Sequence, residues 1–207
     1  ENEKKESNTI ADDLRKKEKK YINQIAQKQK TSLEIDKEIE RLIREAIAKS
    51  NKEKNKSTNF SLTPEALELS KNFTLNKGKL PWPVIRGVVI QKFGTQPHPV
   101  VKTAKIKSNG IIIATVDKEK VRTVFDGTIL SVLQFKGGNP TILVQHGKYI
   151  TAYKNLSKVY VKKGDKVFSG QNIGEVFTNN SNGKSTIQFS VFQNTTPVNP
   201  LLWIIKM

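Results

Sequence analysis

Apolar residues in the first fifty positions recur at helical spacing. The series Ile25, Ser32, Ile35, Ile39, Leu42 and Ala46 advances by seven, three and four residues, which places its members on one stripe of a helix. The stretch from about Thr9 to Lys49 also contains neither glycine nor proline. A narrow stripe buries too little surface to keep a single helix folded, so this helix needs a partner. The pattern suits a coiled-coil arm or spacer, or a regulatory arm that packs on the rest of the chain.

The next segment reads as a linker followed by a short helix. Residues Ser50 to Asn59 are polar and without periodicity, as in linkers. Thr63, Pro64 and Glu65 then supply an N-cap, a proline in the first turn and an acid near the helix N-terminus. We expect a helix from here to about Phe73, a lid or regulatory element near the groove described below.

After Lys79 the pattern changes to period-two alternation broken by glycine, asparagine and proline, which is typical of short strands. The predicted strands are 84–91, 110–115, 121–124, 127–135, 140–146, 149–154, 158–161, 173–177 and 185–193. Tight turns at Asp126-Gly127, Gly137-Gly138-Asn139, His146-Gly147 and Asn182-Gly183 separate them. The predicted fold class is therefore α+β, with a helical coiled-coil arm and linker (1–59), a short helix (60–79) and an all-β domain (80–207).

The composition limits the kinds of catalytic and metal-binding sites that the chain can form. The chain has no cysteine and two histidines, His98 and His146, which excludes thiolate metal sites, cysteine nucleophiles and any site that needs three imidazoles. No apolar run approaches 18 residues, so no membrane-spanning segment is expected. The chain opens on Glu1 without a leader, as expected of a mature or trimmed protein.

The charge lies mainly in the predicted β domain. Beyond Asn76 there are 19 basic residues and five acidic ones, a balance of +14 within the net +17 of the chain. Aromatic residues make up 7% of the sequence and form no stacking platform with arginine, which argues against nucleic acid as a partner. Anionic envelope polymers or lipid head groups, or simple solvation, explain the charge better.

The order of several sequence blocks adds a family resemblance. These are LPWPV at 80–84, NGIII at 109–113, VFDGTILSV at 124–132, VKKGDKVFSGQNIGEV at 161–176, STIQFSVF at 185–192 and NPLLW at 199–203. From Leu80 to Trp203 the chain resembles the LytM (lysostaphin-type) zinc endopeptidase domain, a peptidoglycan hydrolase fold. The block at 161–176 also suits lipoyl-type carrier domains, which need a lysine at a hairpin tip for their prosthetic group, but here the following strand continues as a QNIGEVF edge.

The resemblance implies that the zinc site has been lost. It places Ser108 and Ile112 at two ligand positions, Thr186 and Gln188 at a third ligand and a catalytic base, and Asn155 at a further catalytic histidine. Because a zinc peptidase needs three nitrogen or oxygen ligands and an open position, we expect no metal, no cofactor and no catalytic residue. The five acids of the domain are too scattered for a carboxylate-based hydrolase, so we expect no enzyme.

A LytM-type fold that has lost its zinc ligands and catalytic residues suggests that the groove has kept a function of its own, the binding of a partner. Alternation puts Thr186, Gln188, Ser190 and Phe192 on one face of the last long strand. The complete predicted partner-binding groove consists of Ser108, Asn109, Ile112, Tyr153, Asn155, Thr186, Gln188, Ser190 and Phe192. These uncharged side chains suit an amphipathic protein segment better than a polar glycan.

The order of helical arm, short helix and degenerate domain is similar to the EnvC-type activators of cell-wall amidases. That resemblance implies a periplasmic protein whose groove binds the helix that blocks an N-acetylmuramoyl-L-alanine amidase, close to peptidoglycan. It also implies an arm that restrains the groove and an FtsEX-type transporter that binds the tip of the coiled coil, a tip we expect to be missing from these residues. The alternative is a peptidoglycan-binding or structural LytM module of the envelope with no amidase partner.

Overall fold

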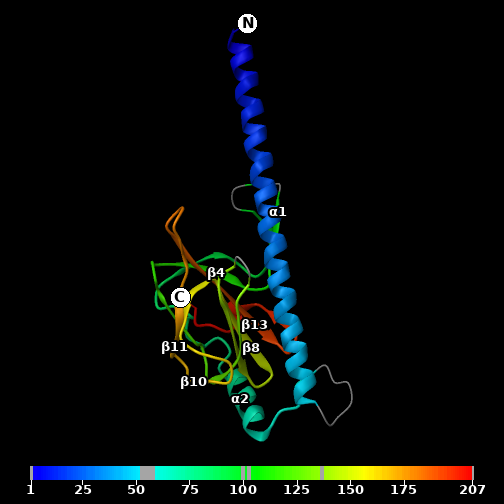
Figure 1. Ribbon diagram of the computed structural model, residues 1–207, viewed down its shortest axis with the longest axis vertical. Helices are drawn as coiled ribbons and strands as arrows, with labels where there is room; N and C mark the ends of the chain where they lie inside the picture. Colours follow the sequence, from blue (N-terminus) through cyan, green and yellow to red (C-terminus); the bar gives the residue numbers. More distant parts are fainter. Residues whose placement is uncertain (1, 52–58, 99–100, 102–103, 136–137, 207) are drawn as a thin grey trace. The chain divides into compact units, whose positions relative to one another are not determined.

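The computed structural model describes residues 2–51, 59–98, 101, 104–135 and 138–206. It contains two compact units: the first combines helix α1 (Asn2–Ser50) as far as Ile39 with the hairpin between Thr95 and Lys107, and the second holds the rest (Figure 1). Most of the predicted linker between Ser50 and Asn59 lies outside the described residues, as does Gly137 of one predicted turn. No helix in the described part of the chain has the length and apolar composition needed to cross a bilayer.

The first unit confirms the predicted N-terminal helix. Strands β2 (Gly94–Pro97) and β3 (Lys105–Ser108) pair beside it, and the amide of Lys107 donates a hydrogen bond of 3.2 Å to Oε1 of Gln29. Toward the N-terminus, Ile10 and Leu14 are 57% and 60% exposed. The helix is thus established, while a coiled-coil partner for it stays a prediction.

The second unit is built on two antiparallel sheets. The larger is nine-stranded, in the order β1-β4-β13-β8-β7-β6-β10 with β12 and β14 also paired to β13, and the smaller has the order β5-β11-β9. The strands are β1 (Val88–Gln91), β4 (Ile111–Thr115), β5 (Lys120–Arg122), β6 (Gly127–Leu133), β7 (Thr141–His146), β8 (Tyr149–Lys154), β9 (Leu156–Val159), β10 (Lys166–Val167), β11 (Asn172–Val176), β12 (Thr178–Asn179), β13 (Lys184–Gln193) and β14 (Thr196–Val198). Every predicted strand overlaps one of these. The sequence missed β2, β3, β10, β12 and β14, which at two to four residues are too short for a period-two pattern to be recognised.

One apolar core joins the two sheets. Residues of β13 alternate so that Ile187, Phe189 and Val191 enter this core, together with Ile111 and Ile113 of β4. From the smaller sheet, Val121 of β5 and Ile173 and Val176 of β11 meet them, together with Leu156 at the start of β9. The face of the larger sheet that points into this core is called the inner face below, and the opposite one the outer face.

Helix α2 (Pro64–Leu75) belongs to this core. Thr63 caps the helix by accepting a hydrogen bond from the amide of Ala66, as the sequence predicted. Phe73 is fully buried and stacks on His146 and Tyr149 at centroid distances of 5.1 and 4.7 Å. Because α2 delivers Phe73 to the inner side, it is not the element near the groove that we expected.

His146 forms the polar centre of the same core. Its Nδ1 lies 2.6 Å from the carbonyl of Asp126, so this nitrogen donates, and Nε2 lies 2.8 Å from the hydroxyl of Thr151. Burial lowers the pKa of His146 to about 4, against the opposing effect of Asp126. The imidazole is therefore neutral at pH 7, as expected of a structural histidine.

The smaller sheet carries a charge cluster around Glu175. Lys120 and Lys158 approach its carboxylate at 2.6 and 3.1 Å, and the hydroxyl of Tyr160 donates to it as well. These hydrogen bonds, that of Lys120 first, hold the pKa of Glu175 at about 2. One acid thus pairs with two of the many lysines of the domain, and the cluster keeps a net charge of +1.

The close approach of α2 to the β7–β8 turn predicts an effect of Gly147→Ala. Gly147 has φ +68°, and a Cβ there would lie 2.4 Å from the carbonyl oxygen of Ala66. Strain and overpacking should together lower the free energy of unfolding by about 2–5 kcal/mol, measured by urea denaturation. Gly183→Ala is the matched control, since Gly183 has φ +65° and nothing within 4 Å, so it carries the strain alone. Equal losses in both variants would contradict the packing of α2 described above.

The buried imidazole predicts acid sensitivity. The folded pKa of His146, about 4, lies below the ordinary value of 6.5, so the unfolded chain takes up a proton first as the pH falls. The free energy of unfolding should therefore decrease between about pH 6.5 and pH 4, by about 3 kcal/mol at most from this group. The measurement is urea denaturation across that range for the wild type and His146→Gln. Parallel pH profiles for the two proteins would show that His146 does not titrate in this way.

Candidate functional site

The predicted groove corresponds to the outer face of the larger sheet. In the register of the sheet, Ile112 of β4 lies opposite Gln188 of β13, and Gln188 lies opposite Lys154 of β8. The outer-face residues of the central strands are Ile112, Ala114, Thr186, Gln188, Ser190, Phe192, Ile150, Ala152, Lys154, Thr141 and Leu143. Five predicted groove residues thus share this face: Ile112, Thr186, Gln188, Ser190 and Phe192.

One half of the outer face is buried although it lies outside the core. Leu143, Ile150, Ala152 and Ser190 are fully buried and Phe192 is 2% exposed. The apolar residues among them do not belong to the core cluster between the sheets. A sheet face reaches such burial only when another segment covers it.

The last three turns of α1, Glu40–Ser50, supply that cover. Ile43 and Ile47 are 0% and 3% exposed, are spaced four residues apart, and are likewise absent from the core cluster. The end of the helix is tied to the turn after β13, because Asn51 Nδ2 donates to the carbonyl of Asn59 (2.8 Å) and Asn194 Nδ2 donates to Oδ1 of Asn59 (2.9 Å). These turns therefore end beside the turn that follows β13, and we infer from the burial on both sides that they cover the Phe192 end of the outer face.

The other half of the outer face is open. Ile112, Thr186 and Gln188 are partly exposed there. Asn155 joins them from the bend after β8: its Nδ2 donates to the carbonyl oxygen of Thr186 at 2.6 Å, and its Oδ1 accepts from Nδ2 of Asn139 at 2.6 Å. Asn155 has φ +72°, a left-handed conformation that asparagine tolerates better than most residues. Four of the five residues that the resemblance places at zinc-ligand or catalytic positions thus lie close together: Ile112, Asn155, Thr186 and Gln188.

Ser108 is the last residue of β3, and Asn109 follows it in the turn that precedes β4. Ser108 is 4% exposed, and its hydroxyl donates to the carbonyl of Gly110 at 2.8 Å. Its side chain therefore stabilises the turn and is not presented to solvent. Asn109 is partly exposed and remains at the edge of the candidate site.

Tyr153 does not line the groove, which corrects the prediction from sequence. It is fully buried in the core, its Oη accepts from the amide of Val124 at 3.0 Å, and burial raises the pKa of its hydroxyl. The register explains the error, since Tyr153 pairs with Phe189, an inner-face residue. Alternation along β8 instead brings Ile150, Ala152 and Lys154 to the outer face, and the YITAYK pattern would have permitted that assignment.

The outer face offers no metal-binding chemistry. Its residues include no histidine, aspartate, glutamate or cysteine, and among the described residues no three such side chains cluster closely enough to hold a metal ion. His146 faces the core, and His98 accepts a hydrogen bond from the amide of Val101 within the first unit. What the face can do is present apolar and amide groups to another segment.

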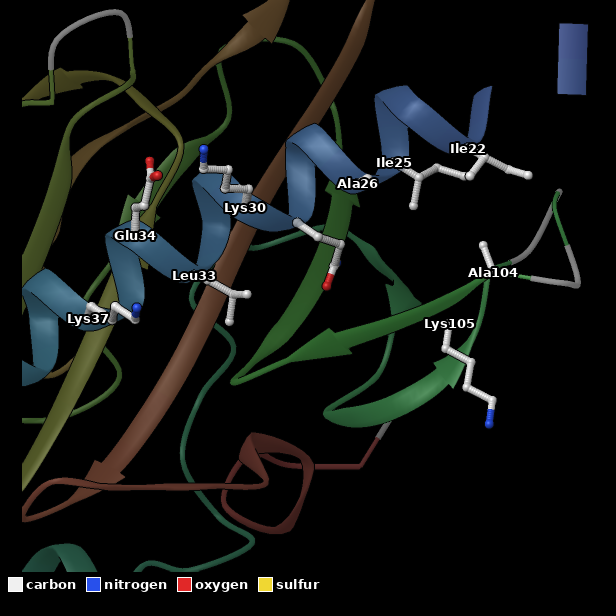
Figure 2. A pocket seen from close by; sticks show the side chains of 10 residues that line it. Ile22, Ile25, Ala26, Lys30, Leu33, Glu34, Lys37, Ala104 and Lys105 are labelled. Carbon is white, nitrogen blue, oxygen red and sulfur yellow. The ribbon is translucent and has the colours of Figure 1, made fainter. Parts of the chain in front are cut away.

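A separate hollow of about 520 Å³ lies within the first unit, between α1 and the hairpin. Figure 2 shows Ile25 and Leu33 on the side of the helix toward Ala104 and Lys105, while Lys30 and Glu34 extend elsewhere. Ile25 is the one member of the predicted stripe that lines this hollow, and the helical row that forms its wall is a different one, Ile22, Ile25, Ala26, Gln29 and Leu33. The hollow shares no residue with the outer face.

Comparisons with known proteins agree with this fold. Residues 106–200 match peptidase family M23. The murein hydrolase activator EnvC of Escherichia coli is 25% identical over 129 residues, which cover 62% of this chain and 29% of EnvC. The peptidoglycan DD-endopeptidase ShyA of Vibrio cholerae is 38% identical over 78 residues, 37% of this chain and 18% of ShyA. The matched part is thus less than a third of either relative.

A solved structure supports the same assignment. Csd3 of Helicobacter pylori superposes with a TM-score of 0.52 at 26% identity, covering 62% of this chain and 35% of that one. The β-rich domain of this chain is therefore a peptidase M23 domain of the LytM type.

Proposed function

We propose that this protein is a non-catalytic activator of a peptidoglycan amidase in the periplasm, and that the outer face binds the helix that blocks the amidase. The observation that carries the proposal is the state of this face: its named residues are apolar or uncharged polar apart from Lys154, no acid or imidazole is among them, one half is open, and the other half is buried beneath another segment. The similarity to EnvC, a murein hydrolase activator, points the same way.

The residues at the family's zinc positions do not fit zinc. Ile112 has no donor atom, the hydroxyl of Ser108 is engaged with Gly110, and the amide of Asn155 is engaged with Thr186 and Asn139. A zinc site that activates water needs three firm ligands and an open position. No hydrolytic step follows from such a set, and the proposed role uses the shape of the groove alone.

The covering turns of α1 indicate what the groove accepts. Ile43 and Ile47 present two branched apolar side chains one helical turn apart to the face that holds Ile150 and Phe192. A partner helix with apolar residues at the same spacing would find the same complementary surface. The partly exposed Gln188 would then fix its register by hydrogen bonds at the open end.

The same turns of α1 would restrain the groove by occupying it. Burial of one isoleucine side chain contributes about 1.5–3 kcal/mol, so two of them favour the covered state by a few kcal/mol. A partner displaces the helix only to the extent that it binds the uncovered state better. Recruitment through the remainder of α1, by a transporter of the FtsEX type, would supply such a bias at the division site.

A second candidate function is a wall-binding module without an amidase. The balance of +14 beyond Asn76 favours it, because a basic surface attracts anionic envelope polymers. Binding to purified sacculi that weakens steeply with salt, with no effect on any amidase, would select this candidate.

The first test is dye release from labelled sacculi. The protein alone should release no dye and should carry less than about 0.1 zinc per chain by atomic absorption, since the groove lacks ligands. Added to a zinc amidase from the same organism, it should raise release by about tenfold or more. Release by the protein alone, with about one zinc per chain, would contradict the proposal.

Substitutions in the covering helix and in the open half of the groove should change amidase activation in opposite directions. Ile43→Asp with Ile47→Asp removes the cover and should raise activation by about tenfold, while Ile112→Lys at the open end should lower it by a similar factor. Both are made in the full chain, because a truncation at residue 77 would also remove Phe73 from the core. Activation is measured by dye release, and retention of the fold by circular dichroism.

Matched controls exist on exposed surfaces. Ile10→Asp with Leu14→Asp places the same charges on a part of α1 where the side chains are 57% and 60% exposed. Ile205→Lys, at a position 49% exposed, matches Ile112→Lys. If the control pair activated as strongly as the Ile43 and Ile47 pair, restraint by the last turns of α1 would be wrong.

A further inference from the structure

Helix α2 borders a second hollow in the β-rich unit. The hollow has a volume of about 440 Å³ and is lined by Leu67, Ser70, Lys71, Thr74, Leu75 and Lys148. Lys148 comes from the turn between β7 and β8, and the other residues come from α2, where Ser70 and Thr74 lie against the β-rich unit and Leu67 and Leu75 are exposed. These six residues are called the α2 surface below. A hollow of this size accepts one or two large apolar side chains.

The α2 surface exposes apolar side chains in a helical row. Leu67 and Leu75 are 48% and 74% exposed, and with Lys71 between them they follow i, i+4 spacing. Leu75 is the most exposed large apolar side chain in the described part of the protein. The helix needs neither leucine for its own packing, since Phe73 on another side anchors it in the core. Exposed apolar rows beside a hollow are typical of interaction sites.

The rim of the hollow is positively charged. Lys71 and Lys148 line it, and the ammonium group of Lys148 lies 5.5 Å from the centre of the Tyr149 ring, which keeps it at the mouth. The acids of α2, Glu65 and Glu68, do not line the hollow. An occupant with carboxylates beside an apolar side chain would match both features.

We propose that the α2 surface binds an acidic amphipathic helix of a partner protein, with an apolar side chain in the hollow and carboxylates near Lys71 and Lys148. A second copy of this chain is a less suitable occupant of the α2 surface, because each copy has a net charge of +17 and would be repelled by the two lysines. This site does not depend on the proposed amidase function. The helix packs with the inner side of the larger sheet, whereas the groove is on the outer face, so the two surfaces can be occupied independently.

The test uses the full chain and a fluorescein-labelled peptide of glutamate and leucine with leucines at i, i+4 spacing. Fluorescence anisotropy should show saturable binding in the micromolar range. Leu75→Ser, and separately Lys71→Glu with Lys148→Glu, should each weaken the affinity by about tenfold or more. Phe168→Ser, at a position 67% exposed, and Lys162→Glu with Lys163→Glu are matched controls that should change it by less than about twofold.

Four results would overturn the proposal. The first is equal binding of a scrambled peptide of the same composition, and the second is equal affinity of the Leu75 or lysine variants. The third is loss of binding to phosphatidylglycerol vesicles in Leu75→Ser without any saturable peptide binding, which would assign the surface to lipid. The fourth is a dimer in sedimentation that Leu75→Ser dissociates, which would assign it to a second copy.

Discussion

All six residues of β8 are buried, so the larger sheet needs a cover on each of its faces. The inner cover is part of the core, because the β5-β11-β9 sheet, α2 and the segment around Trp203 enclose one continuous apolar cluster. The outer cover includes the last three turns of a long helix, held by Ile43, Ile47 and the hydrogen bonds around Asn59. The organisation of the candidate site follows from this difference. Loss of the outer cover would leave the core intact, and the proposed exchange with a partner requires this.

The named residues of the groove include no histidine, aspartate, glutamate or cysteine, and the proposed role of the groove is to bind a helix. In the M23 family this face would carry metal ligands, whereas here an isoleucine, two amides and a threonine meet at the same place. Asn139, Asn155 and Thr186 satisfy one another, so the open half is ordered without an ion. A face of this composition favours the binding of an apolar helix and has no group that could activate water toward a scissile bond. Both features agree with the proposed activating role.

Sequence reasoning predicted the elements better than the contacts between them. The long helix, the cap at Thr63 and nine strands are visible in periodicity and turn residues because each depends on local spacing. Tyr153 was misplaced because a resemblance was followed in place of strand alternation, which puts it beside Phe189. The role of Ile43 could not be predicted, since it depends on which distant face the helix meets. Helix α2 was expected near the groove, and only the stacking of Phe73 on His146 and Tyr149 shows that it serves the core.

The central claim is that a partner and the last turns of α1 compete for one face. Hydrogen–deuterium exchange of the full chain, with and without the amidase, tests it most directly. The account predicts that amide exchange in Glu40–Ser50 becomes faster when the amidase binds, while β13 becomes protected. If the amidase bound and protected β13 but exchange in Glu40–Ser50 stayed the same, the helix would not be displaced and the account would be wrong.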